Sequence, residues 1–359
     1  MYRHLTVMPD VHQGYGCPIG TVFASKGVVV PNLVGVDIGC GMLAVRSNIP
    51  ADLPELAWVL PKVVDLVKKR VPVGFFWNDK PCDPALMPNV SSVPPDSVVL
   101  HNIDDARLQL GTLGGGNHFI EVQAGSDGML WFMIHSGSRN LGKKVAEEYN
   151  NIAVELNARW HSAVPKAWQL AFLPLDTQEG RDYMAEMRYC VEFALANRML
   201  MAQRITNAFY DAMPGTVSLE FSEPINIAHN FAALEHHFGE NVVVHRKGAT
   251  PAHVGLTGII PGSMGTASYI VEGLGNRESF MSCSHGAGRQ MGRGEAKRRL
   301  DLEQQAKMLD DQGIIHGMTS VDNLDEAPGA YKDIDQVMAD QTDLVRIVTK
   351  LRPLAVVKG

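Results

Sequence analysis

The spacing of apolar residues predicts helices over residues 56–70, 143–160, 184–213 and 294–310. The last of these is rich in charge. In the third, six residues recur near one face, and we expect them to fill the core rather than form a binding stripe: Met184, Met187, Val191, Leu195, Met199 and Ala202.

Short apolar runs predict buried strands over residues 28–30, 43–45, 130–134, 241–245 and 353–357. The proline-rich stretch 71–98 is expected to be a long surface loop. Short strands scattered among helices, without repeats or a clear linker, indicate an α+β fold. We therefore expect residues 1–359 to form a single large domain of mixed sheets and helices.

Composition narrows the class of protein. An apolar fraction of 45% can fill a real core, and 20% charged residues is ordinary for a soluble chain. The net charge of -7 argues against a protein that wraps nucleic acid, but not against a local basic groove. The N-terminus has no signal-peptide pattern, and no apolar run reaches the roughly 18 residues of a membrane span. We predict a cytoplasmic protein.

Metal-ligand residues stand in four separate turns that are rich in Gly, Ser or Asn: Asp37 with Cys40, then His118, His135 and His229. Each alone is more often structural, but four such turns together predict one divided metal site in a central cleft. Thiolate, imidazole and carboxylate donors suit a borderline ion such as zinc, manganese or iron. The five cysteines form no CxxC pair, and we interpret Cys40 as a ligand.

A further histidine, His285, precedes the glycine-rich segment Gly286-Ala287-Gly288-Arg289. Such a loop lets backbone approach a phosphate, and an imidazole nitrogen can attack phosphorus when the other nitrogen is held. A sixth metal ligand or an ordinary loop histidine is an equally good interpretation of these residues. His236, His237 and His253 have no supporting context and are expected at the surface.

Longer motifs resemble the RtcB family of RNA-splicing ligases, from near residue 7 to the C-terminus. The matching segments are Met8-Pro9-Asp10-Val11-His12, residues 35–42, 116–121, 135–139, 246–249, 261–265 and 284–289, and the terminal Val357-Lys358-Gly359. Family members usually have a few dozen residues before the first motif, whereas seven precede it here. This difference bears on folding more than on chemistry, since every ligand motif is retained.

The resemblance implies an RtcB-like fold and a GTP- and manganese-dependent RNA ligase. Such an enzyme joins a 2′,3′-cyclic phosphate or 3′-phosphate end to a 5′-hydroxyl end through a histidine–GMP intermediate, in tRNA splicing or RNA repair. The resemblance also allows for an accessory protein that activates the enzyme. Two Mn²⁺ ions would be bound by the five residues above, with Cys40 bridging. His285 would be the nucleophile, and Asp10 would orient it or support the metal site.

The resemblance further implies a guanylate pocket formed by Asn117, Glu121, Asn230, Pro261, Gly262, Ser263, Met264, Ser268, Gly286, Ala287, Gly288 and Lys358. Phosphates of RNA would be neutralised by basic residues in or beside the motifs: Arg139, Arg246, Lys247, Arg289 and Arg293. Two other classes stay open. A metal-dependent phosphohydrolase that opens cyclic phosphates would not need His285 or Lys358, and a silent RNA-end binding module would not need intact ligands.

Overall fold

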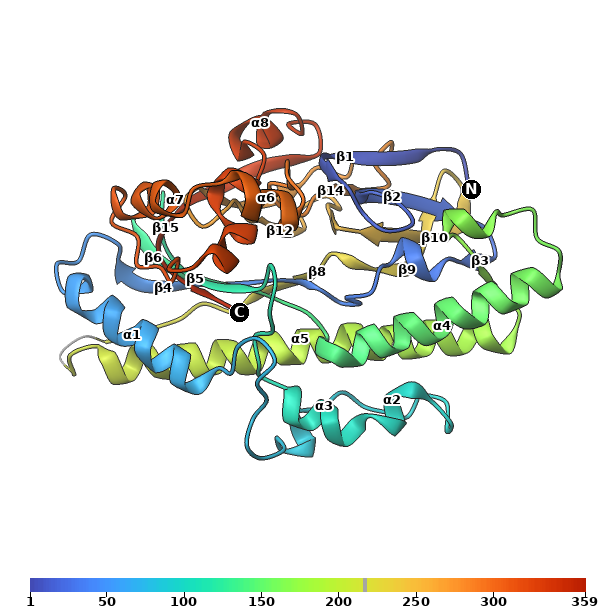
Figure 1. Cartoon of the computed structure of the whole chain (residues 1–359), viewed down its shortest axis with the longest axis horizontal. Coiled ribbons are helices and arrows are strands. Elements are labelled where there is room, and N and C mark those ends of the chain that lie inside the picture. Colours follow the sequence, from blue (N-terminus) through green and yellow to red (C-terminus); the bar gives the residue numbers. More distant parts are fainter. Residues whose placement is uncertain (216–217) are drawn as a thin grey trace.

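The computed structural model describes residues 1–215 and 218–359. In Figure 1 two long helices, α4 (Arg139–Arg159) and α5 (Gln178–Ala212), run side by side beneath a layer of strands, and the C-terminal helices lie above it. Helices and strands alternate irregularly along the chain, which confirms the predicted mixed α/β organisation. No helix within the described ranges is both long and apolar enough to cross a membrane.

The larger sheet has seven antiparallel strands within the described residues, in the order β12-β13-β15-β5-β6-β4-β8. In that order they span Thr257–Ile260, Ser268–Gly273, Val345–Lys358, Phe119–Gly125, Met129–Ser136, Gly41–Pro50 and Ile225–Ala228. A second sheet has the order β1-β2-β10-β9, from Leu5–His12, Ile19–Ser25, Glu240–Lys247 and Asn230–His237. Two strand pairs complete the β-structure: β3 (Val28–Val29) with β7 (Leu173–Pro174), and β11 (Ala249–Pro251) with β14 (Ser282–Ser284).

The first helix, α1, spans Leu56–Arg70, the predicted bounds. The shorter helices are α2 (Val98–His101), α3 (Ile103–Gln109), α6 (Arg293–Arg299), α7 (Leu302–Asp310) and α8 (Ile334–Ala339). Short 3-10 turns cover Pro31–Leu33, Pro84–Leu86, Lys166–Trp168, Val321–Glu326 and Pro328–Ala330. Between α1 and α2 the chain has no α-helix or strand in its described residues, so the predicted long loop is confirmed.

The alternation of side chains along the large sheet decides which face carries chemistry. On β4, Leu43 and Val45 pack in the core shared with α1 and α5, while Met42 and Ala44 belong to a cluster on the opposite face. Each fully buried Leu or Val contributes about 1.5–3 kcal/mol to folding. Since Met42 pairs with His135 of β6, that histidine shares the face turned away from the helices.

Three helix predictions need correction. Helix α5 begins at Gln178, six residues before the predicted start. The predicted helix 294–310 is two helices, because the chain turns at Leu300 and the side chain of Asp301 accepts a hydrogen bond from the Gln304 amide (2.8 Å) to begin α7. Helix α4 begins at Arg139, four residues before the predicted start.

The buried face of α5 also differs from the predicted stripe. Met187 and Ala202 are buried and Met184 and Val191 pack against the core as predicted, but Met199 is 44% exposed. The buried face also carries residues that the prediction left out, such as Cys190, Phe193, Ala194, Asn197, Arg198, Met201 and Ile205. Polar Asn197 and Arg198 lie on this buried face because their side chains form hydrogen bonds with the backbone of other segments. Hydropathy alone therefore does not identify the buried face of α5.

Candidate active site and metal centre

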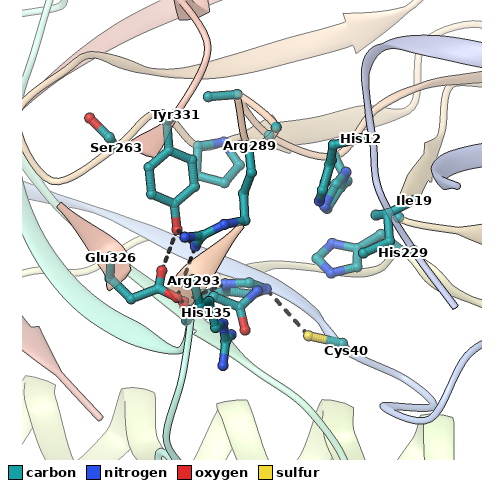
Figure 2. A pocket seen from close by; sticks show the side chains of 18 of the residues that line it. His12, Ile19, Cys40, His135, His229, Ser263, Arg289, Arg293, Glu326 and Tyr331 are labelled. Atoms are coloured by element: carbon teal, nitrogen blue, oxygen red, sulfur yellow. Dashed lines mark hydrogen bonds and ion pairs between the residues drawn. The ribbon is translucent and has the colours of Figure 1, made fainter. Parts of the chain in front are cut away.

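A cavity of about 790 Å³ opens where the two sheets meet, a volume that suits a nucleotide-sized ligand. Figure 2 shows Cys40 and His135 at one end, with His229 and His12 beside them, and Glu326, Tyr331 and Arg289 gathered at another. The strand-end turns and the glycine-rich segments predicted from the sequence therefore line one common space.

Strand register brings the predicted metal ligands together. Gly41, next to Cys40, pairs with Ser136 of β6 on one side and with Ala228 of β8 on the other. Phe119, next to His118, pairs with His135. Neighbouring strands thus deliver their ligands at one end of the sheet, although the residues lie almost 200 positions apart in sequence.

The ligand atoms form two groups that share Cys40. One group contains Cys40, His135 and His229, the other Asp37, Cys40 and His118, and within each group the ligand atoms lie within 4.8 Å of one another. The sulfur of Cys40 is 3.3 Å from His135 Nε2 and 3.5 Å from His118 Nε2. His118 Nε2 is 3.1 Å from Asp37 Oδ2. This geometry suits a thiolate that bridges two ions.

Backbone carbonyls orient two of the imidazoles. His118 Nδ1 donates to the Leu113 carbonyl (3.0 Å) and His135 Nδ1 to the Asn117 carbonyl (3.1 Å), so both Nε2 lone pairs face the cluster. Such outer hydrogen bonds are typical of metal-binding histidines. His229 Nδ1 is buried without a hydrogen-bond partner among the described residues, an arrangement that a bound ligand would satisfy.

The electrostatics of the cluster also favour metal binding. Burial, with the neighbouring histidines, holds the pKa of His135 and His229 well below the ordinary value, so both rings are neutral. Burial and the charge of Asp37 raise the pKa of the Cys40 thiol. A bound cation would offset the free-energy cost of ionising this thiol, since a coordinating thiol is deprotonated.

A small residue and a buried arginine allow this crowding. A side chain at Gly137 would push the Asp37 carboxylate out of its place in the cluster. Arg198 of α5 donates to the carbonyls of Gly39 (3.0 Å) and Ser136 (2.7 Å) and is fully buried. Its guanidinium ties the cysteine turn to the end of β6 and places a positive charge beneath the cluster.

His285 stands beside the metal cluster with one ring nitrogen held. Its Nδ1 lies 2.6 Å from Asp10 Oδ2, and the same oxygen accepts from the backbone amide of His285 (3.0 Å). The His285 ring is 4.9 Å from the ring of His229 between centroids. Gly248 (φ 63°) packs against the other side, where a side chain would crowd His285 and Ile19. Asp10 is itself fully buried, so the pair is fixed in position.

The carboxylate of Glu326, with several cationic partners, lies at the other end of the cavity. Glu326 lies 3.1 Å from Arg289 Nη1, 3.4 Å from Arg293 Nη2 and 3.5 Å from Lys358 Nζ, and it accepts a hydrogen bond from Tyr331. Burial would raise the pKa of Glu326, but Lys358 and the other partners lower it overall. This end of the cavity is therefore strongly polar and positively charged.

Most residues of the predicted guanylate pocket line the cavity. They are Asn117, Glu121, Asn230, Pro261, Gly262, Ser263, Met264, Gly286, Ala287, Gly288 and Lys358. Ser268 does not line it but accepts a hydrogen bond from the Gly262 amide (3.2 Å), so it supports the wall. Asn230 is similarly tied, because its side chain donates to the Asp37 carbonyl (3.1 Å) and accepts from Gly248 (2.7 Å).

The five basic residues predicted to bind RNA have different surroundings. Lys247, Arg289 and Arg293 line the cavity. Arg139 lies under the turn that carries His118 and donates to Thr112 Oγ1 (3.0 Å).

Arg246 is the clear correction. It is fully buried, and its guanidinium bonds both carboxylate oxygens of Glu235 and the hydroxyl of Ser282. It therefore has no surface to offer RNA. His237, predicted at the surface, is buried in the same cluster, where Nε2 lies 2.8 Å from Glu235. Alternation along β9 explains this, since Glu235 and His237 both face inward.

Sequence reasoning missed several residues of the site: His12, Arg198, Glu326 and Tyr331. Burial and the charge of His285 lower the pKa of His12 to about 4, so its ring is neutral beside the cavity. One signal was available for Arg198, because an arginine next to Asn197 interrupts an apolar face of α5. Nothing local marked Glu326, which lies in a short turn between charged helices.

Comparison with known proteins agrees with this geometry. The family described as tRNA-splicing ligase RtcB matches residues 1–93 and 85–359. The RNA-splicing ligase RtcB of Escherichia coli K12 is 38% identical over 381 residues, covering 100% of this chain and 91% of that protein. The tRNA-splicing ligase RtcB of Thermococcus kodakarensis is 33% identical over 428 residues, covering 100% and 88%. The RNA-splicing ligase RtcB of Mycobacterium tuberculosis is 34% identical over 421 residues, covering 98% and 96%.

The fold, the thiolate–imidazole cluster and these similarities define an enzyme of the RNA ligase class. The chain belongs to the RtcB family.

Proposed function

We propose that this chain joins an RNA 2′,3′-cyclic phosphate or 3′-phosphate end to a 5′-hydroxyl end, with GTP and two manganese ions, through a GMP adduct on His285. The observation that carries the proposal is the pairing of His285 Nδ1 with a buried carboxylate, 2.6 Å away, beside the metal cluster. This pairing directs the second ring nitrogen, Nε2, to act as the nucleophile.

The proposed joining reaction has three steps. Nε2 of His285 attacks the α-phosphorus of GTP, an N–P bond forms, and pyrophosphate leaves with the bridging oxygen. Asp10, whose Oδ2 lies 2.6 Å from Nδ1, would offset the positive charge that the ring gains. The RNA 3′-phosphate then takes GMP from the ring, which breaks the N–P bond and forms a phosphoanhydride. The 5′-hydroxyl attacks the 3′-phosphorus and releases its proton, the phosphodiester forms, and GMP leaves. A cyclic phosphate must first be opened by water.

Residues of this chain fit two ions. Asp37 and His118 would hold one, His135 and His229 the other, and Cys40 would bridge them. Bound there, the ions would supply Lewis-acid stabilisation of charge on phosphate oxygens. The donor set alone also fits zinc or iron, so manganese rests on the family resemblance.

The opposite end of the cavity would hold the nucleotide. Glu121 is buried and, once ionised, its carboxylate can accept hydrogen bonds from the N1–H and amino group of a guanine base; the positive charge of Lys358 favours that ionised form. Lys358 and the Gly286–Gly288 segment offer positive charge and close backbone approach for ribose and phosphate. Adenine lacks that pair of donors, so GTP should be preferred over ATP.

Incubation with α-labelled GTP and Mn²⁺ tests the proposal directly. We expect an acid-labile, alkali-stable protein–GMP bond that forms without RNA and is consumed when RNA ends are added. A phosphohydrolase would open cyclic phosphates but carry no label. A silent binding module would bind RNA and do neither. Absence of label at saturating GTP and Mn²⁺ would refute the histidine–GMP route.

A further inference from the structure

Three consecutive aromatic side chains stand in solvent on the loop between α1 and α2. Phe75 is 99% exposed, Phe76 75% and Trp77 39%. We call these three residues the aromatic tip. Single exposed apolar residues are common, but three adjacent large rings form a patch of the kind that marks a binding surface.

Hydrogen bonds anchor the loop on both sides of the aromatic tip. On one side the Gly74 amide donates to the Gly114 carbonyl (2.8 Å), and on the other the Asn78 amide donates to the Leu108 carbonyl (2.9 Å). Arg204 of α5 also donates to the Asn78 side chain (3.0 Å). The backbone that carries the rings is therefore anchored on both sides, which lowers the entropy cost of ordering the loop on binding.

The tip adjoins the rim of the cavity. Gly114 begins the turn that leads to His118, and a side chain at Gly115 would touch Gly74. A side chain at the next residue, Gly116, would meet Arg293, which lines the cavity. Two glycine contacts thus join the aromatic tip to the place where the RNA ends are proposed to react.

Local charge points to a polyanion as the occupant. Residues 68–83, which contain the tip, hold four lysine or arginine residues and two aspartates, whereas the whole chain has a net charge of -7. Flat rings flanked by cations are the usual platform for unpaired bases, because every base has a face that can stack and every nucleotide carries a phosphate.

We propose that the aromatic tip stacks unpaired bases of an RNA strand next to the joined ends. This inference rests on the proposed function, since it assigns a substrate contact to the same site. With bases stacked on the tip, the enzyme would favour RNA ends that are single-stranded near the junction. The loop that carries the tip lies outside the metal and nucleotide cavity.

The test compares three double variants at Phe75 and Phe76, to Ala, Leu and Tyr. Binding of a 5′-labelled single-stranded RNA oligonucleotide with a 3′-phosphate is followed by fluorescence anisotropy. We expect the Ala and Leu doubles to raise Kd by about tenfold or more, and the Tyr double to stay within about twofold, because stacking needs a flat ring. Trp168→Ala, an exposed aromatic (61%) between α4 and α5, is the matched control and should bind as the parent does.

Removing one base of the oligonucleotide at a time locates the contact. An abasic position near the 3′-phosphate should weaken RNA binding by the parent protein. The same abasic position should not weaken RNA binding by the Ala double variant any further. Unchanged Kd in the Ala double overturns the inference. Equal rescue by Leu and Tyr also overturns it, because an apolar surface for a protein partner would then explain the tip. Anisotropy needs no ligation, so absence of a GMP adduct would refute only the proposed function.

Discussion

Two of the places where charged side chains are buried differ in how completely their polar atoms are hydrogen-bonded. In the second sheet, the Arg246 guanidinium bonds both oxygens of Glu235, the Ser282 hydroxyl and the Phe280 carbonyl. Beside the cavity, by contrast, His229 Nδ1, His285 Nδ1 and Asp10 Oδ1 are buried without a hydrogen-bond partner within the described ranges, although His285 Nδ1 lies 2.6 Å from Asp10 Oδ2.

The difference separates structure from chemistry. A closed network stabilises the fold and has no capacity left for a ligand. An incomplete network beside a cavity leaves polar atoms that a bound ligand can satisfy. Motif membership did not distinguish them, since Arg246 and Asp10 both lie in segments that resemble the same family.

Loss of His285 should have the largest effect. We expect His285→Ala to abolish GMP attachment, because no other histidine beside the cavity, among the described residues, is paired with a fully buried carboxylate. Metal content should stay near that of the parent, since His285 belongs to neither ligand group. Radiolabelled GTP and elemental analysis measure the two. His253→Ala is the control, and label on the His285 variant would show that another residue is the nucleophile.

Loss of Cys40 should remove both ions, because its sulfur belongs to both ligand groups. We expect Cys40→Ala to lower metal affinity by more than about 100-fold and to abolish RNA joining. His229→Ala should chiefly affect one ion. Cys190→Ala, a buried cysteine in the helical core, is the matched control and should keep its metal. Full occupancy of both ions in the Cys40 variant would contradict the bridging role.

Breaking the closed network should affect stability rather than chemistry. Arg246→Met leaves Glu235 buried without its cation and should lower the free energy of unfolding by about 3–5 kcal/mol. GMP attachment per folded molecule should not change. Replacing both partners with Met should cost less, because neither charge is then unpaired. Urea unfolding measures this, and a stable Arg246→Met protein with weakened RNA binding would restore the RNA contact predicted from the sequence.

Glu121 gives a pH dependence that the closed network lacks. Burial raises its pKa from 4.5 to about 8, despite the hydrogen bond from Gln123 (2.5 Å) and the charge of Lys358. Between these values the folded chain keeps a proton that the unfolded chain releases, so stability falls as pH rises, by at most about 1.4 kcal/mol per unit. Glu121→Gln should flatten this slope between pH 5 and about 8. Equal slopes in unfolding experiments would show that the carboxyl ionises freely.

Loss of Arg293 should give the smallest effect. Its side chain is 51% exposed at the cavity, so it can contact RNA phosphate as Arg246 cannot. Arg293→Gln should weaken RNA binding by up to about tenfold and reduce the salt slope by about one unit, while GMP attachment is spared. Arg298→Gln, an exposed arginine of the same helix, is the control. An unchanged salt slope would place the RNA path elsewhere.

The sequence by itself predicted the ligand types, the histidine beside the glycine-rich loop, the first helix and the α+β organisation. Each depends on local chemistry: glycine-rich turns display side chains, and apolar spacing marks helices. The break of residues 294–310 into two helices was also local, but the capping signal of Asp301 was outweighed by the continuous charge pattern.

Only the tertiary structure decided which polar residues face the cavity. Strand register joins Cys40, His135 and His229, and long-range packing brings Asp10 to His285 across 275 positions. The same packing buries Arg246 and leaves Arg293 open. Whether a charged residue meets a partner or a cavity depends on contacts far apart in the chain, and no local pattern in the sequence carries that information.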